Sequence, residues 1–115
     1  MNLHIKTFEQ LTSTELYEIL KARSAVFVVE QTCPYQDLDG GDYDSLHVYL
    51  EEEGKILAYL RCYEQDEKTA RIGRVLTVAR GQGYGIPLME AGIKAVREHI
   101  HAESIFIEAQ CYAIG

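Results

Sequence analysis

The residues best suited to do chemistry are the glycines of the turn Arg80–Gly85, which reads Arg-Gly-Gln-Gly-Tyr-Gly. Gly81, Gly83 and Gly85 carry no Cβ atom, so the backbone can adopt positive φ and bring its N–H groups close to a ligand. At the start of a helix such N–H groups lack intrahelical acceptors and lie at the positive end of the helix dipole. The turn therefore predicts a site for a phosphate or another anion, and a glycine-rich connection without a ligand is the alternative.

Two common phosphate-binding motifs do not fit this turn. A Walker A loop places Lys and then Ser or Thr after its last glycine, whereas Gly85 is followed by Ile86 and Pro87. The dinucleotide fingerprint separates its last two glycines by two residues and lies between parallel strands, whereas here the glycines alternate after an expected antiparallel meander. The sequence excludes an ordinary P-loop and argues against a Rossmann site.

The chain before the turn predicts a strand, a helical region and a loop. A short strand is expected at residues 3–7, and Thr12 with Glu15 forms a capping box at the start of a helix. The run at residues 25–29 is rich in β-branched residues and fits either a helix or an extended segment. Proline, glycine and aspartate in residues 31–44 predict a loop.

Period-two alternation then predicts a three-stranded meander that leads into the glycine turn. Leu46, Val48 and Leu50 share one face of the first strand, and His47 lies on the polar face. After a turn at residues 53–55, the second strand is expected to place Ile56, Ala58, Leu60 and Cys62 on one face. The third strand is expected at residues 70–77, with Gly73 as a bulge.

The segment after the turn predicts a helix and a parallel strand. Apolar residues at helical spacing include Ile86, Met89, Ile93, Val96 and Ile100, with Pro87 in the first turn, where a missing N–H costs least. A strand at residues 104–109 would return parallel to the preceding strand. Residues 1–115 are therefore expected to form a single domain of the α+β (mixed α/β) class.

Composition limits the partners and the compartment. With 18 acidic and 11 basic side chains the net charge is −7, which argues against nucleic acid and favours a cationic substrate. Cys33, Cys62 and Cys111 are odd in number and far apart, so a reducing compartment and buried, unpaired thiols are expected. No signal-like or membrane-spanning run is evident in the sequence, and a cytoplasmic protein without membrane contact is predicted.

The glycine turn and several other segments resemble one known superfamily. Arg80, Gly83 and Gly85 fit the Arg/Gln-x-x-Gly-x-Gly/Ala turn of the GCN5-related N-acetyltransferases (GNAT). The sequence Val-Phe-Val-Val-Glu-Gln at residues 26–31, Cys-Pro-Tyr at 33–35 and Ile-Gly-Arg-Val at 72–75 resemble the ElaA-like branch. The resemblance covers nearly the whole chain and implies the GNAT fold and acetyl-CoA-dependent acyl transfer to a small-molecule or peptide amine.

The resemblance also implies which residues bind the cosubstrate acetyl-CoA. Backbone amides from Gln82 to Gly85 would hold the pyrophosphate, and the strand before the turn would bind the pantetheine through its main chain. A main-chain N–H of that strand could polarise the thioester carbonyl. The cofactor-binding residues expected from the resemblance are Val75, Leu76, Thr77, Arg80, Gly81, Gln82, Gly83, Tyr84 and Gly85.

Acyl transfer requires a base, because an ammonium group has no lone pair with which to attack. The catalytic candidates are Glu30, which follows an apolar run, and His47. Asp39, Glu64 and Glu108 are the other titratable residues near the ends of elements. Asp37, Asp39, Asp42 and Asp44 could attract a cationic acceptor, or they form an acidic surface loop. They do not match a calcium loop, and no metal is expected.

The chain departs from the family pattern after the strand at residues 104–109. Relatives are expected to add another helix and further strands, including a tyrosine that protonates the CoA thiolate, and Tyr112 is not at the matching position. Either the chain is a C-terminally truncated piece, or it binds CoA without full catalysis. An incomplete sheet would leave an open edge, which predicts a homodimer. A CoA-binding module and an interaction protein are therefore the alternatives to an acetyltransferase.

Overall fold

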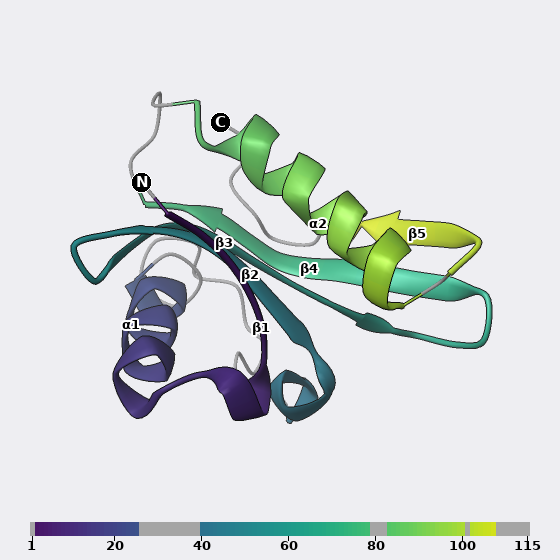
Figure 1. Ribbon diagram of the computed structural model, residues 1–115, viewed down its shortest axis with the longest axis horizontal. Helices are drawn as coiled ribbons and strands as arrows, with labels where there is room; N and C mark the ends of the chain where they lie inside the picture. The colour runs from purple at the N-terminus through teal and green to yellow at the C-terminus, as the bar shows by residue number, and fades with distance from the viewer. Residues whose placement is uncertain (1, 26–39, 79–82, 101, 108–115) are drawn as a thin grey trace.

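The computed structural model shows a mixed five-stranded sheet between two helices (Figure 1). It describes residues 2–25, 40–78, 83–100 and 102–107. Within them, no helix has the length and apolar character needed to span a bilayer. The elements are β1 (Asn2–Thr7), the 3-10 helix η1 (Phe8–Gln10), α1 (Ser13–Arg23), the 3-10 helix η3 (Gly41–Asp44), β2 (Leu46–Glu52), β3 (Lys55–Glu64), β4 (Thr69–Thr77), α2 (Gly85–His99) and β5 (Ser104–Ile107).

The strands follow the order β1-β2-β3-β4-β5 across the sheet. The first four are antiparallel neighbours, and β5 pairs parallel with β4 through Thr69–Ile72 and Ser104–Ile107. A parallel neighbour requires a crossover, and α2 provides it. The predicted meander, crossover and α+β class are thus confirmed.

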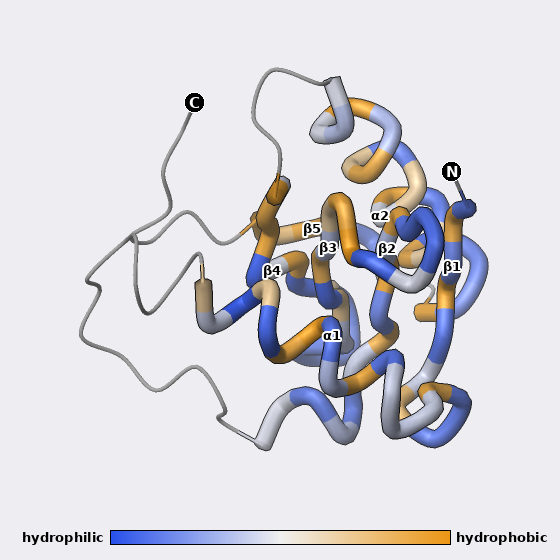
Figure 2. Tube along the Cα trace, turned by 90° about the vertical axis from the view of Figure 1, so that its left-hand side faces the viewer, coloured by the Kyte–Doolittle hydropathy of each residue, from blue (hydrophilic) through white to orange (hydrophobic). Residues whose placement is uncertain are grey.

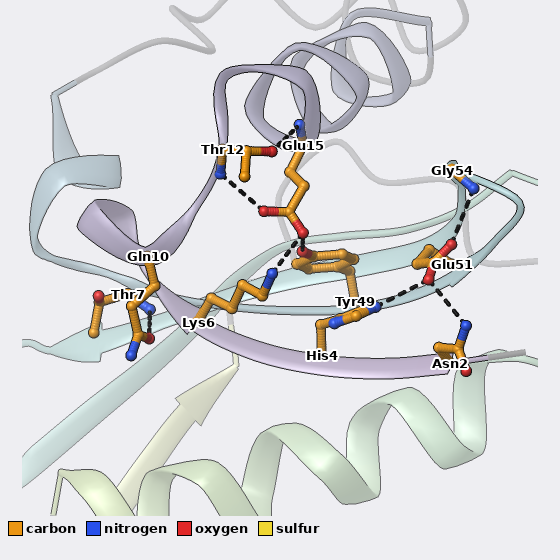
Figure 3. A network of polar contacts seen from close by, with 10 residues as sticks. All are labelled: Asn2, His4, Lys6, Thr7, Gln10, Thr12, Glu15, Tyr49, Glu51 and Gly54. Atoms are coloured by element: carbon orange, nitrogen blue, oxygen red, sulfur yellow. Dashed lines mark hydrogen bonds and ion pairs between the residues drawn. The ribbon is translucent and has the colours of Figure 1, made fainter.

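The predicted capping box starts α1 and also fixes this helix to the sheet (Figure 3). The Thr12 hydroxyl accepts a hydrogen bond from the Glu15 N–H at 3.1 Å, and Glu15 Oε1 accepts one from the Thr12 N–H at 2.8 Å. The other Glu15 oxygen accepts from Lys6 on β1 and from the Tyr49 hydroxyl on β2. Burial raises the pKa of Glu15, but these hydrogen bonds outweigh it and lower the pKa to about 2. Glu15 therefore joins α1 to two strands.

Each face of the sheet is covered by one helix and carries its own core (Figure 1). Figure 2 shows hydrophobic and hydrophilic residues following one another along the strands and both helices. The α2 side buries Val48, Ala58, Leu60, Ile72 and their neighbours, and the α1 side buries Ile19, Tyr49, Ile56, Tyr59 and Leu76. The prediction that Ile56 shares a face with Ala58, Leu60 and Cys62 is wrong for Ile56. The register between β2 and β3 shifts at Leu50/Glu51, which inserts Leu57 and turns Ile56 to the α1 side.

The buried face of α2 differs from the predicted one. Leu88, Ala91, Gly92, Ala95 and Val96 are buried, whereas Ile86 is 73% exposed. The reason is a close approach of the helix to β3: a Cβ on Gly92 would lie 2.8 Å from Leu60 Cδ2. Small residues thus set the rotation of α2, and larger apolar residues such as Met89 and Ile93 pack beside this contact.

The β2–β3 hairpin contains a residue whose replacement is expected to stabilise the fold. Glu52 pairs with Lys55, so Glu53 and Gly54 form a two-residue loop with φ of 53° and 83°, as in a type I′ turn. Left-handed backbone is unfavourable for Glu and tolerated by Asn, so Glu53→Asn should raise the free energy of unfolding by about 1 kcal/mol. Urea unfolding measures this change. Glu53→Gln removes the same charge without the turn preference, and an equal gain in that variant would contradict the explanation.

Candidate active site

A β-bulge interrupts β4 close to the predicted cofactor-binding strand segment. Arg61 pairs with Gly73 and Tyr59 pairs with Leu76, so Leu60 alone opposes the two residues Arg74 and Val75. Arg74 has φ of 54°, which is uncommon for a residue with a side chain. The bulge therefore lies at Arg74–Val75 and not at Gly73 as predicted. Such bulges often re-aim a strand beside a functional site.

The bulge reverses which residues of β4 face each helix. Ile72 belongs to the α2-side core before the bulge, and Leu76 belongs to the α1-side core after it. Val75 packs against the α2-side core. Pairing with β5 extends to Ile72, opposite Ile107, while β4 continues to Thr77 (Figure 1). Among the described residues, no strand pairs with this edge of β4 beyond Ile72, so the main chain of Val75–Thr77 is placed where a ligand could bond to it.

The end of the glycine turn starts α2, as predicted. Arg80, Gly81 and Gln82 lie outside the described residues. Gly83 has φ of 74°, a conformation that favours glycine, and Tyr84 is the N-cap residue. Gly85 is not left-handed, and a Cβ built on it would meet no atom of the described residues within 4 Å, its chain neighbours and nearby helix backbone aside. These residues therefore give no steric reason for a glycine at position 85, whereas a ligand close to the helix N-terminus would give one.

His47 is buried between the sheet and its α1-side neighbours, so its predicted placement on a polar face is wrong. Its side chain is 0% exposed, because α1 and η3 cover this face of β2. Its Nε2 lies 3.0 Å from the Asp42 carbonyl oxygen and its Nδ1 lies 2.6 Å from the Tyr59 hydroxyl. A carbonyl can only accept, so Nε2 carries the proton and Nδ1 accepts from Tyr59. Both ring nitrogens of His47 are thus engaged inside the protein.

Asp42 is likewise buried, contrary to its prediction as part of an acidic surface loop. It is 7% exposed, and its Oδ1 accepts from Arg23 Nη1 at 2.6 Å and from Arg61 Nη1 at 3.0 Å. Burial raises the pKa of Asp42, but the two guanidinium groups outweigh it and hold the pKa below the ordinary value. Asp42 is therefore an ionised structural carboxylate and is not available to a cationic acceptor. Asp44 is exposed.

Arg23 and Arg61 belong to a buried cluster that was not predicted from the sequence. Arg23 lies four residues after the buried Ile19 on α1, and Arg61 lies within the apolar run of β3. The available signal was a charged residue at a core position in each of two predicted elements. Because buried charges need partners, such residues indicate a buried ion pair. The cluster Arg23–Asp42–Arg61, supported by His47 and Tyr59, is the main polar group under α1.

The burial of His47 predicts a specific pH dependence of stability. Burial lowers the pKa of His47, and Arg23 and Arg61 lower it further, while the carbonyl and charge of Asp42 raise it. Because the folded-state pKa lies below the ordinary 6.5, the unfolded chain binds more protons than the folded one as the pH falls. The contribution of His47 to the free energy of unfolding is therefore complete above pH 6.5 and declines below it. Urea midpoints measured between about pH 7.5 and about 5.5 should fall for the wild type and fall less for His47→Gln. Equal slopes for the two proteins would contradict this assignment.

The remaining candidates add little to the site. Glu30, Asp37, Asp39, Glu108, Tyr112, Cys33 and Cys111 lie outside the described residues, as does the run at residues 26–29. Glu64 is exposed at the end of β3. Burial raises the pKa of Cys62 to about 12, so this free thiol is a core residue and not a nucleophile. Within the described residues, no group of His, Cys, Asp or Glu side chains could hold a metal ion.

Comparisons with known proteins agree with this fold. The profile of the Acetyltransferase (GNAT) family matches residues 12–114. Protein ElaA of Escherichia coli is 35% identical over 109 residues, which cover 90% of this chain and 71% of ElaA. The crystal structure of ElaA has a TM-score of 0.85 at 32% identity, over 93% of this chain and 76% of that one.

Two further crystal structures share the fold. An acyl-CoA N-acyltransferase from Pseudomonas aeruginosa is 40% identical, with a TM-score of 0.84 over 95% of this chain and 79% of that one. A protein from Clostridium acetobutylicum described as a predicted acetyltransferase, solved with acetyl-CoA, is 13% identical, with a TM-score of 0.69 over 94% and 80% of the two chains. The family match and the identity to ElaA show that the chain is a transferase of the GNAT acetyltransferase family, in its ElaA-like branch.

Proposed function

We propose that this protein transfers the acetyl group of acetyl-CoA to a primary amine of a small molecule or peptide. The observation that carries the proposal is the path from the β4 bulge at Arg74–Val75 to the glycine turn at the N-terminus of α2. It offers main-chain groups along a strand and then a helix start, in the order that a pantetheine followed by a pyrophosphate requires. Membership of the GNAT family supports the acyl transfer.

The residues present fit acetyl-CoA. The main chain of Val75, Leu76 and Thr77 would bond to the pantetheine, and the amides of Gln82, Gly83, Tyr84 and Gly85 would hold the pyrophosphate, with Arg80 and Gly81 at the entrance. The open space beside Gly85 supports this placement, because a bulky phosphate group must approach the N–H groups there without meeting a side chain. The net charge of −7 favours a cationic amine as acceptor.

Bound acetyl-CoA would supply an acetyl group activated as a thioester. A main-chain N–H at the bulge would stabilise negative charge on the carbonyl oxygen. The amine nitrogen would form the new C–N bond while the C–S bond breaks. The proton that the nitrogen loses would pass through a base to the sulfur, so that CoA leaves as a thiol. We assign the base to Glu30, directly or through water, and expect His47 to act only through its neighbours, because its ring nitrogens are already engaged.

Two measurements on the wild-type protein test the proposal. Calorimetric titration and thermal shift with acetyl-CoA should both show binding. CoA thiol release should then exceed the blank with at least one of spermine, lysine or a tripeptide with a free N-terminus. Absence of binding would leave the glycine turn as a plain connector, and binding without thiol release would indicate a CoA-binding module.

A further inference from the structure

Arg74 on β4 combines two unfavourable features at one position. Its φ of 54° lies in the left-handed region, which is unfavourable for a residue with a Cβ atom. The residue is also only 3% exposed, so its charged guanidinium group is removed from bulk water. Among the described non-glycine residues, the other one with positive φ is Glu53, which lies in an exposed hairpin turn. Backbone strain that is kept inside a sheet needs a reason in its surroundings, and such strain is frequent at functional sites.

The left-handed residue changes the direction of the side chains that follow it. Leu60 on β3 alone opposes Arg74 and Val75, and pairing between the strands resumes at Leu76. In a regular strand the side chains alternate, so Ile72 and Leu76, four positions apart, would share one face. They instead belong to opposite cores, Ile72 on the α2 side and Leu76 on the α1 side. The conformation of Arg74 therefore sets the orientation of the strand segment after it.

That segment, Val75–Thr77, is the part of the proposed cofactor site that β4 contributes. Its inner edge pairs with β3, where Leu76 is opposite Tyr59 and Thr77 is opposite Ala58. Along its outer edge, no strand of the described residues pairs with β4. Main-chain N–H and C=O groups alternate between the two edges of a strand with the same period as the side chains. A strand without the bulge would thus present different main-chain groups to a ligand at the outer edge.

We propose that Arg74 is a positioning residue for acyl transfer: its buried side chain holds the left-handed backbone of the bulge and thereby aims the main-chain groups of Val75–Thr77 at acetyl-CoA. This inference rests on the proposed function. It assigns to the guanidinium group no contact with acetyl-CoA or with the acceptor. An alanine at position 74 has no such side chain and favours negative φ, whereas a glycine adopts positive φ unaided. Glycine should therefore restore much of what alanine removes.

Two pairs of variants on β4 test this role. Arg74→Ala and Arg74→Gly remove the same guanidinium group and differ by one methyl group. In Arg74→Ala, the affinity for acetyl-CoA and the kcat/KM should both fall at least about tenfold. In Arg74→Gly, both losses should be at least about fivefold smaller than in Arg74→Ala. Titration calorimetry gives the affinity, and CoA thiol release gives kcat/KM with whichever of spermine, lysine or the tripeptide the wild type acetylates fastest.

Arg71→Ala and Arg71→Gly are the matched control. Arg71 is an arginine of the same strand without positive φ, and it lies before the bulge, where β4 still pairs with β5. Both Arg71 variants should keep acetyl-CoA affinity within about threefold of wild type. Urea midpoints should be higher for Gly than for Ala at position 74 and lower for Gly than for Ala at position 71, because glycine weakens an ordinary strand. The same order at both positions would contradict a role of the backbone at Arg74.

Three results would overturn the proposal. Equal losses in Arg74→Ala and Arg74→Gly would show that the guanidinium group itself is required, and wild-type affinity in both would show that the site does not depend on Arg74. Failure of both variants to fold would show that Arg74 serves the fold as a whole. If the wild type binds acetyl-CoA but acetylates none of the amines, the proposed function fails, and the affinities of the Arg74 variants still decide whether this residue positions β4 for acetyl-CoA.

Discussion

Asp42→Ala is expected to lower the free energy of unfolding by about 3–5 kcal/mol. Asp42 Oδ1 accepts from both Arg23 and Arg61, and all three side chains are buried. Removing the carboxylate leaves two neighbouring guanidinium groups without the negative charge that they share. The cost is therefore that of breaking a buried ion pair, and it exceeds the value of a surface ion pair, which is about 0–1 kcal/mol.

Urea unfolding of Asp42→Ala and of Asp44→Ala measures this difference. Asp44 belongs to the same 3-10 helix but is exposed, so its substitution should change stability by no more than about 0.5 kcal/mol. A loss below about 1 kcal/mol in Asp42→Ala would mean that the two guanidinium groups find other compensation as the cluster relaxes. Arg23→Met and Arg61→Met should each be milder than Asp42→Ala, because the carboxylate keeps one arginine.

Local patterns were sufficient to predict most of the elements. The capping box at Thr12 and Glu15 needs only residues three apart, and the β2–β3 hairpin follows from alternation around Glu53-Gly54. The parallel placement of β5 follows from a helix between two strands, because handedness and chain length leave few other connections. These features depend on backbone chemistry within short stretches, so a single sequence contains them.

Side-chain orientation was less predictable, since it depends on irregular backbone and on the opposite layer. One inserted residue, Leu57, turned Ile56 to the other face, and the bulge at Arg74–Val75 did the same for Leu76. Alternation also suggested a polar face for β2, yet α1 covers that face and buries His47. A period-two pattern cannot reveal whether a second helix covers the polar side of a strand.

The same contrast holds for the candidate site. The glycine turn was recognisable because its function is performed by consecutive backbone groups. The cluster around Asp42 was not recognisable, because Arg23 and Arg61 each lie 19 positions from Asp42 in the sequence. The three residues belong to three different elements, α1, η3 and β3. Only the packing of α1 over the sheet brings them together.

Gly85→Ala is expected to weaken acetyl-CoA binding at least about tenfold, or about 1.4 kcal/mol, without destabilising the protein. Among the residues that the structure describes, a Cβ at this position meets no atom within 4 Å beyond its chain neighbours and nearby helix backbone, and the backbone there is not left-handed. Alanine is also the better helix former by about 1 kcal/mol at an interior position, so stability should be unchanged or higher. We therefore expect the added methyl group to act on a ligand that approaches the first turn of α2.

Gly83→Ala provides the contrast that separates a ligand effect from a folding effect. Gly83 has φ of 74°, so an alanine there should cost about 1–2 kcal/mol of stability even though its Cβ also meets no atom within 4 Å in the described part of the chain. Titration calorimetry with acetyl-CoA and thermal unfolding of both variants give the two quantities. Weaker binding in Gly85→Ala at full stability would place the pyrophosphate beside α2, since full stability would show that the methyl group neither strains nor overpacks the folded protein. If Gly85→Ala instead binds acetyl-CoA with wild-type affinity, the glycine turn is not part of the cofactor site. The proposed site would then keep β4 for the pantetheine but have no residues for the pyrophosphate of acetyl-CoA.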